Sequence, residues 1–178
     1  MGVYDWLFYE FEKEETHWDG MLPQFQAYFR GTKHIEGAQI YLPYRAFLKP
    51  GVIGKGLHFH RDEEYLAFVG HDLRNAFESF DAEIEMWLGE TPETMEKIVI
   101  TEPTMVRVPQ FYWHGDIEIK RLGKPLFFQP VLFNSRYYAV SKVVDEDGFE
   151  TFIAQCEGYS PDPKNPDERL DFSKLVIE

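Results

Sequence analysis

Two histidines and a glutamate lie close together in the segment GKGLHFHRDEEYLAFVG, residues 54–70. His58 and His60 are two positions apart, so on a β-strand both imidazoles point to the same side, roughly 6–7 Å apart along the chain. Glu64 comes four residues after His60, and on a straight strand it would lie about 20 Å from His58. The polar residues 61–63 are therefore expected to turn the chain, so that Glu64 begins the next strand beside the two histidines.

A further histidine follows much later, in the segment MVRVPQFYWHGDI. Pro109 is expected to end a strand and the aromatic residues 111–113 to form a loop, after which His114 begins the next strand. Imidazole nitrogens and carboxylate oxygens are common ligands of transition-metal ions. His114 is therefore a candidate ligand of the same metal ion as His58, His60 and Glu64.

Short strand signals surround these residues. Runs rich in Val, Ile, Tyr and Phe are broken by Gly and Pro, and no helical pattern separates them, which predicts an antiparallel sandwich or barrel. The predicted strands cover residues 38–48, 57–60, 64–69, 81–88, 97–100, 104–108, 115–120 and 125–133.

The spacing of these residues resembles the two signature motifs of the cupin superfamily. The first motif is matched by Gly51, His58, His60, Glu64 and Gly70, with the two glycine spacings off by one. The second is matched by Pro109 and His114, with Phe111 where glycine is usual and Glu118 where asparagine is usual. The resemblance covers roughly residues 38–135. It implies an all-β fold, the double-stranded β-helix or cupin jelly-roll barrel, and it implies that the three histidines and Glu64 are the metal ligands.

Three neutral imidazoles and one carboxylate suit several divalent ions, namely Fe(II), Mn(II), Ni(II), Co(II) and Zn(II). An octahedral ion held by four ligands keeps two positions open for water, substrate or dioxygen. The family resemblance implies iron or manganese, whereas the donor atoms alone do not choose among these metals.

Other polar residues are candidates for the surroundings of the metal. Asp116 and Glu118 share strand parity with His114, so they either face inward as catalytic groups or pair with a basic residue on a neighbouring strand. Tyr112 is a candidate acid or base, and Tyr41 is a candidate for substrate binding; both also fit simple aromatic packing. Two arginines within strands either bind a carboxylate or phosphate or lie at the surface, and these are Arg45 and Arg107.

Composition and charge divide the chain into three parts. Residues 1–35 are aromatic and acidic and are interpreted as an arm, residues 36–140 as the cupin domain, and residues 141–178 as a short helix followed by an extended acidic tail. The helix is predicted from the apolar spacing of Phe149, Phe152, Ile153 and Cys156, and the tail from three prolines between residues 161 and 166. The net charge of −13 comes almost entirely from the two ends.

The sequence also restricts partners and location. The central part has no basic stripe, which argues against nucleic acid, and no apolar run is long enough for a membrane span. We find no signal-peptide pattern, so a cytoplasmic location is expected. The predicted function is a metal-dependent enzyme that acts on a small organic acid or oxygenated compound, with oxygenase chemistry preferred. The alternatives are a non-catalytic binding or sensing module and a sugar or sugar-phosphate isomerase, and the resemblance also implies a homodimer.

Overall fold

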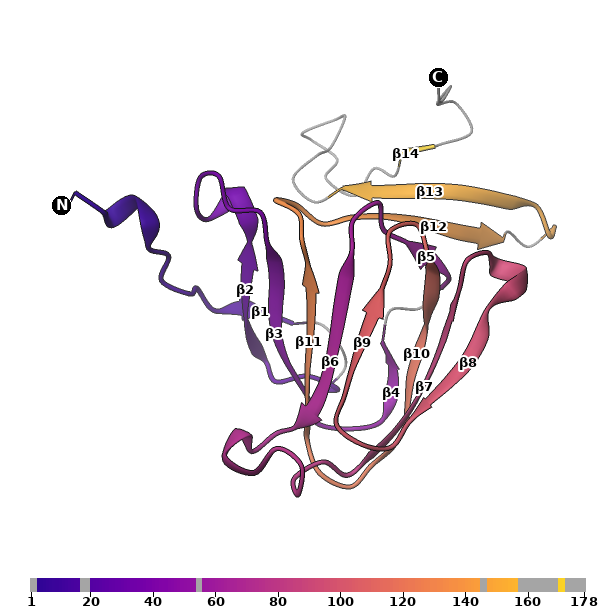
Figure 1. Ribbon diagram of the computed structural model, residues 1–178, viewed down its shortest axis with the longest axis horizontal. Helices are drawn as coiled ribbons and strands as arrows, with labels where there is room; N and C mark the ends of the chain where they lie inside the picture. Colours follow the sequence, from indigo (N-terminus) through magenta and orange to yellow (C-terminus); the bar gives the residue numbers. More distant parts are fainter. Residues whose placement is uncertain (1–2, 17–19, 54–55, 145–146, 157–169, 172–178) are drawn as a thin grey trace.

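The predicted strands form two antiparallel sheets that pack face to face (Figure 1). The computed structural model describes residues 3–16, 20–53, 56–144, 147–156 and 170–171. In these ranges hydrogen-bonded ladders join strands within each sheet and none joins the two sheets. The fold is therefore an all-β sandwich of the jelly-roll type, as predicted, rather than a closed barrel.

The six-stranded sheet carries the second half of the first motif. Its strands follow the order β1-β2-β3-β11-β6-β9. Their bounds are β1 Glu14–Glu15, β2 Phe25–Arg30, β3 Tyr41–Phe47, β11 Leu126–Leu132, β6 Glu64–Gly70 and β9 Thr104–Val108.

The eight-stranded sheet carries the three histidines. Its order is β14-β13-β12-β5-β10-β7-β8, with β4 also paired to β10. The bounds are β4 Gly51–Ile53, β5 His58–Phe59, β7 Ala82–Gly89, β8 Glu96–Ile100, β10 Trp113–Leu122, β12 Tyr138–Val144, β13 Glu150–Cys156 and β14 Leu170–Asp171. Short 3₁₀ turns lie at Asp5–Leu7 (η1), Gly31–Lys33 (η2), Leu73–Asn75 (η3) and Pro92–Thr94 (η4).

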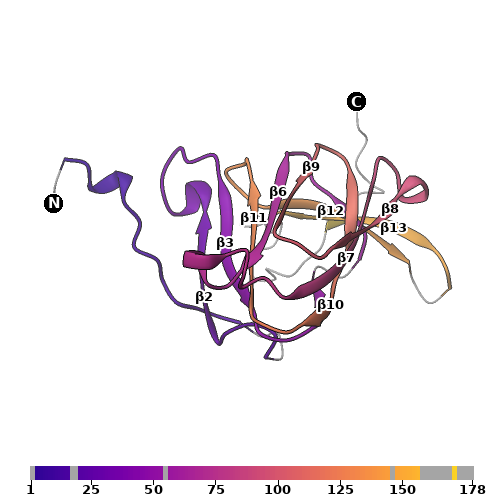
Figure 2. The ribbon, with the colours of Figure 1, turned by 60° about the horizontal axis from the view of Figure 1, so that its bottom comes forward.

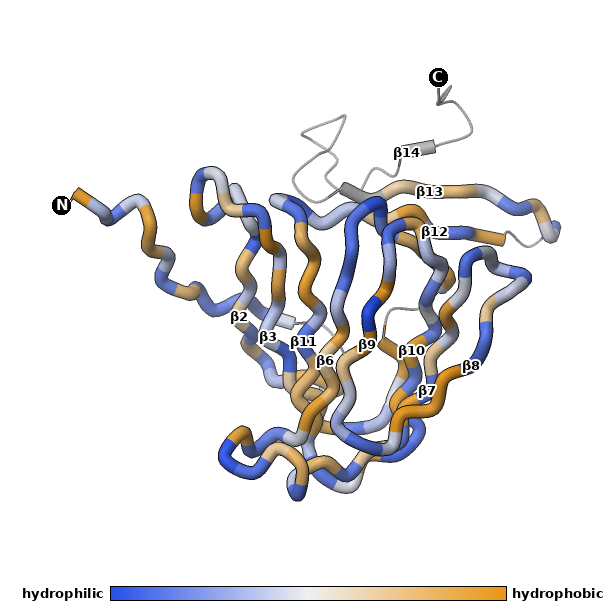
Figure 3. Tube along the Cα trace, in the orientation of Figure 1, coloured by the Kyte–Doolittle hydropathy of each residue, from blue (hydrophilic) through white to orange (hydrophobic). Residues whose placement is uncertain are grey.

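The core lies between the two sheets and is filled by alternate residues of each strand. Along β6 and β11 every second side chain is buried, as expected for strands with one face toward a core. Figure 3 shows hydrophobic segments of β7, β8 and β10 meeting at one end of the sandwich. The core cluster takes residues from both sheets. Its large buried members include Phe47, Phe68, Ile84, Met86 and Ile119. The aromatic and aliphatic content predicted to build a core is used here.

The C-terminal helix predicted over residues 149–156 is wrong. The structure has strand β13 there, paired residue by residue with β12. A few apolar positions in eight residues fit a helix and a strand equally well, and Thr151, Phe152 and Ile153 favour a strand where a partner is available. The proline-rich tail and the side chain of Cys156 lie outside the described residues.

Both ends of the chain contribute strands to the sheets. β2, from the predicted arm, pairs with β3, and β12 crosses the predicted boundary at residue 140. We keep residues 36–140 as the proposed cupin domain, with extensions that widen its sheets. No helix in the described ranges is both long and apolar enough to span a membrane.

Candidate metal centre

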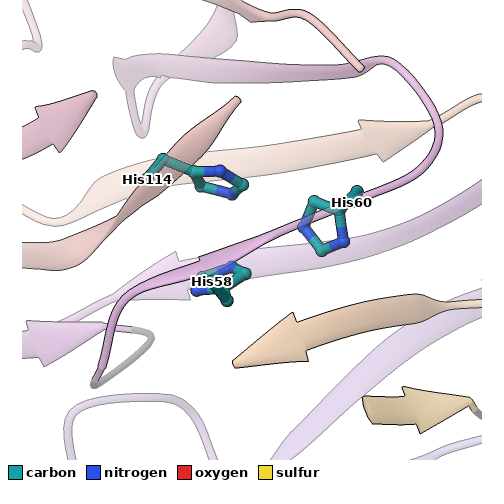
Figure 4. A group of neighbouring side chains, drawn as sticks. All are labelled: His58, His60 and His114. Carbon is teal, nitrogen blue, oxygen red and sulfur yellow. The ribbon is translucent and has the colours of Figure 1, made fainter. Parts of the chain in front are cut away.

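Three histidine side chains from two neighbouring strand segments lie close together (Figure 4). His58 lies on β5, His60 directly follows it, and His114 lies near the start of β10, where it pairs with His58. One ring nitrogen from each histidine lies within 4.8 Å of the others. The strand pairing of β5 with β10 therefore brings together histidines that are more than fifty residues apart in the sequence.

Glu64 completes the group from the opposite sheet. It is the first residue of β6, and its side chain is buried. Its Oε2 atom lies 3.4 Å from Nε2 of His60 and 3.1 Å from Nε2 of His114. The chain turns at residues 61–63 and crosses between the sheets, which confirms the expected turn. Oε2 is buried without a well-formed hydrogen bond, so a carboxylate oxygen and imidazole nitrogens face one another around a point that a cation fits.

The other ring nitrogen of each histidine is held by the backbone. Nδ1 lies 3.1 Å from the carbonyl oxygen of Gly56 for His58, and 2.6 Å from that of Tyr138 for His60. For His114 the corresponding distance, to the carbonyl oxygen of Tyr112, is 3.2 Å. A carbonyl only accepts, so the proton is on Nδ1 and the Nε2 lone pair is free to bind a metal. The three histidines form one group, and Glu64 adjoins two of them, so all four stay candidate ligands.

Burial controls the charge state of this group. Burial, reinforced by His114 and His60, lowers the pKa of His58 to about 3, so this imidazole stays neutral. Burial alone would raise the pKa of Glu64, but the neighbouring His60 and His114 hold it below its usual range. Burial would lower the pKa of His60, yet the Glu64 carboxylate raises it overall. A neutral imidazole and an ionised carboxylate are the forms that bind metal.

These pKa shifts predict how the stability of the metal-free protein depends on pH. Below pH 6.5 the unfolded chain protonates His58 and the folded chain does not, so stability falls by up to about 1.4 kcal/mol per pH unit as pH decreases toward 3. The lowered pKa of Glu64 acts in the same direction below pH 4.5. The raised pKa of His60 contributes stability below pH 6.5 that is lost as pH rises through its folded value.

We therefore expect maximal stability of the chelated protein near neutral pH, measured as the free energy of unfolding in urea. The variant His58→Gln removes the lowered pKa of His58 and serves as the control. Its stability should change less between pH 6.5 and 4.5 than that of the unsubstituted chain. Equal acid sensitivity of the two proteins would contradict the prediction.

The second motif forms a tight turn beside the site. Phe111, in the place where cupins usually have glycine, has a φ of 63°, the left-handed conformation that glycine adopts most easily. Its N–H donates a hydrogen bond of 2.8 Å to the carbonyl of His60. The two motifs are thus joined directly through their backbones, and the turn keeps the glycine geometry although the residue is a phenylalanine.

Asp116 and Glu118 do not take the inward alternative, in which they would be catalytic groups beside the metal ligands. A β-bulge follows His114, with φ values of 146° at Gly115 and 43° at Asp116, and it shifts the register of β10 against β7. After the bulge the odd-numbered residues face the core. Asp116 is exposed and accepts a hydrogen bond from the N–H of Gly56, while Glu118 is 40% exposed and paired with Lys120. The extra residue reversed the parity on which the prediction rested.

Two other predicted site residues are also directed elsewhere. The Tyr112 hydroxyl donates a hydrogen bond of 2.9 Å to Glu90, so its side chain is held away from the ligands. Tyr112 contacts the site through its backbone carbonyl, which lies beside His114. Arg107 lies on the outer face of β9, is 61% exposed and pairs with Glu63. Of the two alternatives for Arg107, binding a carboxylate or phosphate and lying at the surface, the structure shows the second.

Tyr41 and Arg45 face the interior from β3. Tyr41 is buried and lies level with Glu64, because Leu132 on β11 pairs with both residues. Arg45 is on the same face, about 13 Å further along the strand, with its guanidinium 5.7 Å from the ring centroid of Tyr28. Both side chains face the space between the sheets, as a substrate-binding role requires. Arg45 is the more distant of the two from the metal ligands, because it lies four residues further along β3.

Tyr137 is a neighbour of the site that sequence reasoning missed. Its ring centroid lies 5.4 Å from that of His60 and 5.7 Å from that of Tyr41, so the two tyrosines form one aromatic wall beside the ligands. Tyr137 precedes β12, whose pairing with β5 brings it there. No local motif marks it in the sequence.

Comparison with solved structures agrees with this architecture. A mutant of Bacillus subtilis oxalate decarboxylase matches with a TM-score of 0.50 and 15% identity over 73% of this chain and 29% of that chain. The structure of the same enzyme at pH 4.6 matches with a TM-score of 0.51 and 15% identity over 72% and 29%. The chain therefore spans less than a third of the proteins it resembles. No protein-family model and no curated protein sequence matches it.

The two packed sheets and the histidine group define a jelly roll with a candidate metal site. Oxalate decarboxylases are cupins, and the similarity to them is one of fold. The chain has the cupin fold, which confirms the resemblance inferred from its two motifs.

Proposed function

We propose that the protein is a metal-dependent cupin enzyme that acts on a small organic acid or oxygenated compound, with oxygenase-type chemistry. The observation that carries the proposal is the group of His58, His60, His114 and Glu64, gathered from both sheets with their metal-binding atoms facing one another. Four protein ligands leave positions open on an octahedral ion, and a bound metal would supply Lewis-acid or redox chemistry there. Iron or manganese is preferred, whereas nickel, cobalt and zinc are possible.

The chain's own residues would bind and orient the substrate. Tyr41 and Tyr137 form an apolar wall with hydroxyl groups beside the ligands, and Arg45 is an inward-facing cation deeper in the sandwich. A wall of this kind suits a small molecule with apolar and acidic parts. The structural neighbours named above are oxalate decarboxylases, and their substrate by name belongs to the same class of small organic acids.

A non-catalytic binding or sensing module is the second candidate. It is favoured by the orientation of Tyr112, Asp116 and Glu118, the predicted acid–base residues, which point away from the ligands. The third candidate, a sugar or sugar-phosphate isomerase, needs a carboxylate to shuttle a proton, and Asp116 and Glu118 do not face the ligands. We further propose a homodimer, a cytoplasmic location and no nucleic-acid partner.

The test is elemental analysis of protein purified without a chelating tag, which should find close to one transition-metal ion per chain. Because the metal links two sheets, chelation is expected to lower the melting temperature by about 8–16 °C without unfolding the protein. Dioxygen uptake with a panel of small organic acids then separates the two candidates. Unchanged ligand binding by the Zn(II)-loaded protein, with no dioxygen consumed by the Fe(II)-loaded protein, would support the binding module instead.

A further inference from the structure

Ser141 on β12 lies directly beside the candidate metal ligand His58. The ladder between β12 and β5 places these two residues opposite each other. The next residue, Lys142, donates its N–H to the carbonyl of Leu57 at 2.9 Å, so Ser141 and His58 form a pair without hydrogen bonds between their backbones. In such a pair the side chains are closest and share one side of the sheet, with Cβ atoms about 4.5–5.5 Å apart. Ser141 therefore faces the space that Glu64 enters from the other sheet.

The hydroxyl of Ser141 has no hydrogen-bond partner in the part of the chain that the structure describes. Its side chain is half-buried, so the hydroxyl is neither fully solvated nor sealed within the core. A serine hydroxyl can both donate and accept a hydrogen bond. Ser141 thus offers a polar group to a molecule that binds beside His58.

Exposure along this face increases toward Ser141. Strand pairing sets four residues in one row, His114, His58, Ser141 and Ile153. His114 is buried, whereas the other three are half-buried. β12 and β13, which carry the last two, run crosswise to β6 and β11 at the end of the sandwich where β6 begins (Figures 1 and 2). The open side of the ligand group is therefore the side on which Ser141 lies.

The charge of the loaded site favours an anion. A divalent ion held by three neutral imidazoles and the single carboxylate of Glu64 keeps a net positive charge. The neighbouring residues on the same face of β12 and β13 are Ser141, Val143 and Ile153, and none of them is charged. Attraction between opposite charges is stronger in a partly buried site than in water, and a carboxylate accepts strong hydrogen bonds.

We propose that Ser141 is a substrate-binding residue and that its hydroxyl donates a hydrogen bond to a carboxylate bound at the metal. The proposal rests on the metal-dependent function proposed above and narrows its substrates to acids whose carboxylate lies between the metal and β12. Ile153, the next residue in the row, contacts the apolar part of such an acid. This row thus presents a metal, a hydroxyl and an apolar side chain in order.

Acetate binding by the full chain loaded with Co(II) tests the proposal. The visible absorption of the ion reports an anion entering its coordination sphere. Ser141→Ala should bind acetate about 10- to 100-fold more weakly, the range expected for losing a hydrogen bond to a charged group. Its metal content and melting temperature should be those of the unsubstituted chain, because Ser141 is not a proposed ligand.

Two variants of nearly equal shape isolate the hydroxyl. Ser141→Thr keeps the hydroxyl and Ser141→Val replaces it with a methyl group, so of these two only the valine variant should show the 10- to 100-fold loss. Thr151→Ala is the matched control, because this hydroxyl lies on β13 opposite Val143, about 12 Å from His58. Its affinity for acetate should equal that of the unsubstituted chain.

The outcomes separate this proposal from the proposed function. Equal acetate affinity of the Ser141→Ala variant and the unsubstituted chain, both fully loaded, would overturn the role of Ser141. So would equal weakening by the threonine and valine variants. Acetate binding that depends on Ser141, without dioxygen uptake by the Fe(II)-loaded protein, would support this role and contradict the oxygenase chemistry alone. A chain that binds no transition metal would contradict both.

Discussion

Protein carrying His60→Ala is expected to bind its transition metal about 100-fold more weakly than the unsubstituted chain. Structural metal sites with four ligands bind with about 10–16 kcal/mol, so each ligand accounts for roughly 3 kcal/mol, or about a 100-fold change in affinity. His60 is buried, and its Nε2 atom lies 3.4 Å from Oε2 of Glu64. Metal content by mass spectrometry and affinity by competition with a chelator measure the effect.

Two comparisons separate loss of a ligand from loss of the fold. Glu64→Gln keeps the shape of the side chain but removes its charge, so it should weaken metal binding while the circular dichroism spectrum stays unchanged. His71→Ala changes an exposed histidine outside the group and should leave the metal content as it is. Full metal content in the double variant His58→Ala, His60→Ala would show that the metal is bound elsewhere.

Gly115→Ala is expected to lower both stability and metal content, although Gly115 binds no metal. A Cβ atom at this position would lie 2.4 Å from the carbonyl oxygen of Gly56, and the φ of 146° disfavours any other residue. The backbone must therefore shift next to His114 and next to the carbonyl that holds His58. We expect a loss of about 3 kcal/mol or more in the free energy of unfolding, because close contact adds to backbone strain.

Gly37→Ala is the matched control for backbone strain alone. Gly37 also has a positive φ, 79°, but a Cβ atom there meets nothing within 4 Å. Its substitution should cost about 1 kcal/mol and leave the metal content unchanged. Equal effects of the two substitutions, measured by urea unfolding and elemental analysis, would mean that the close approach to Gly56 does not position the ligands.

Three of the four candidate ligands could be predicted from a local signal, and His114 was added through the spacing of the second motif. Histidines two apart must share one side of a strand, and a polar turn before Glu64 is the simplest way to bring it beside them. The strand positions were equally readable: β3, β5 to β11 all overlap predicted segments. Short apolar runs separated by Gly and Pro leave few other interpretations.

The surroundings of the metal could not be predicted, because they depend on contacts between distant segments. Parity along a strand allowed Asp116 and Glu118 to face inward, and one bulge beside Gly115, which passes close to Gly56, turned them outward. The residues around 149–156 became a strand because β12 offered a partner along its length.

The sequence by itself determined the residue types and spacing of the metal ligands and the class of the fold. The tertiary structure alone decided which tyrosines stand beside those ligands and which arginine faces inward. Tyr137 reaches His60 through the pairing of β12 with β5, and Arg107 faces outward because its neighbour Val108 pairs with the inward-facing Glu64. The physical reason is that side-chain direction in a sheet depends on register, and register is set by pairing between strands far apart in the chain.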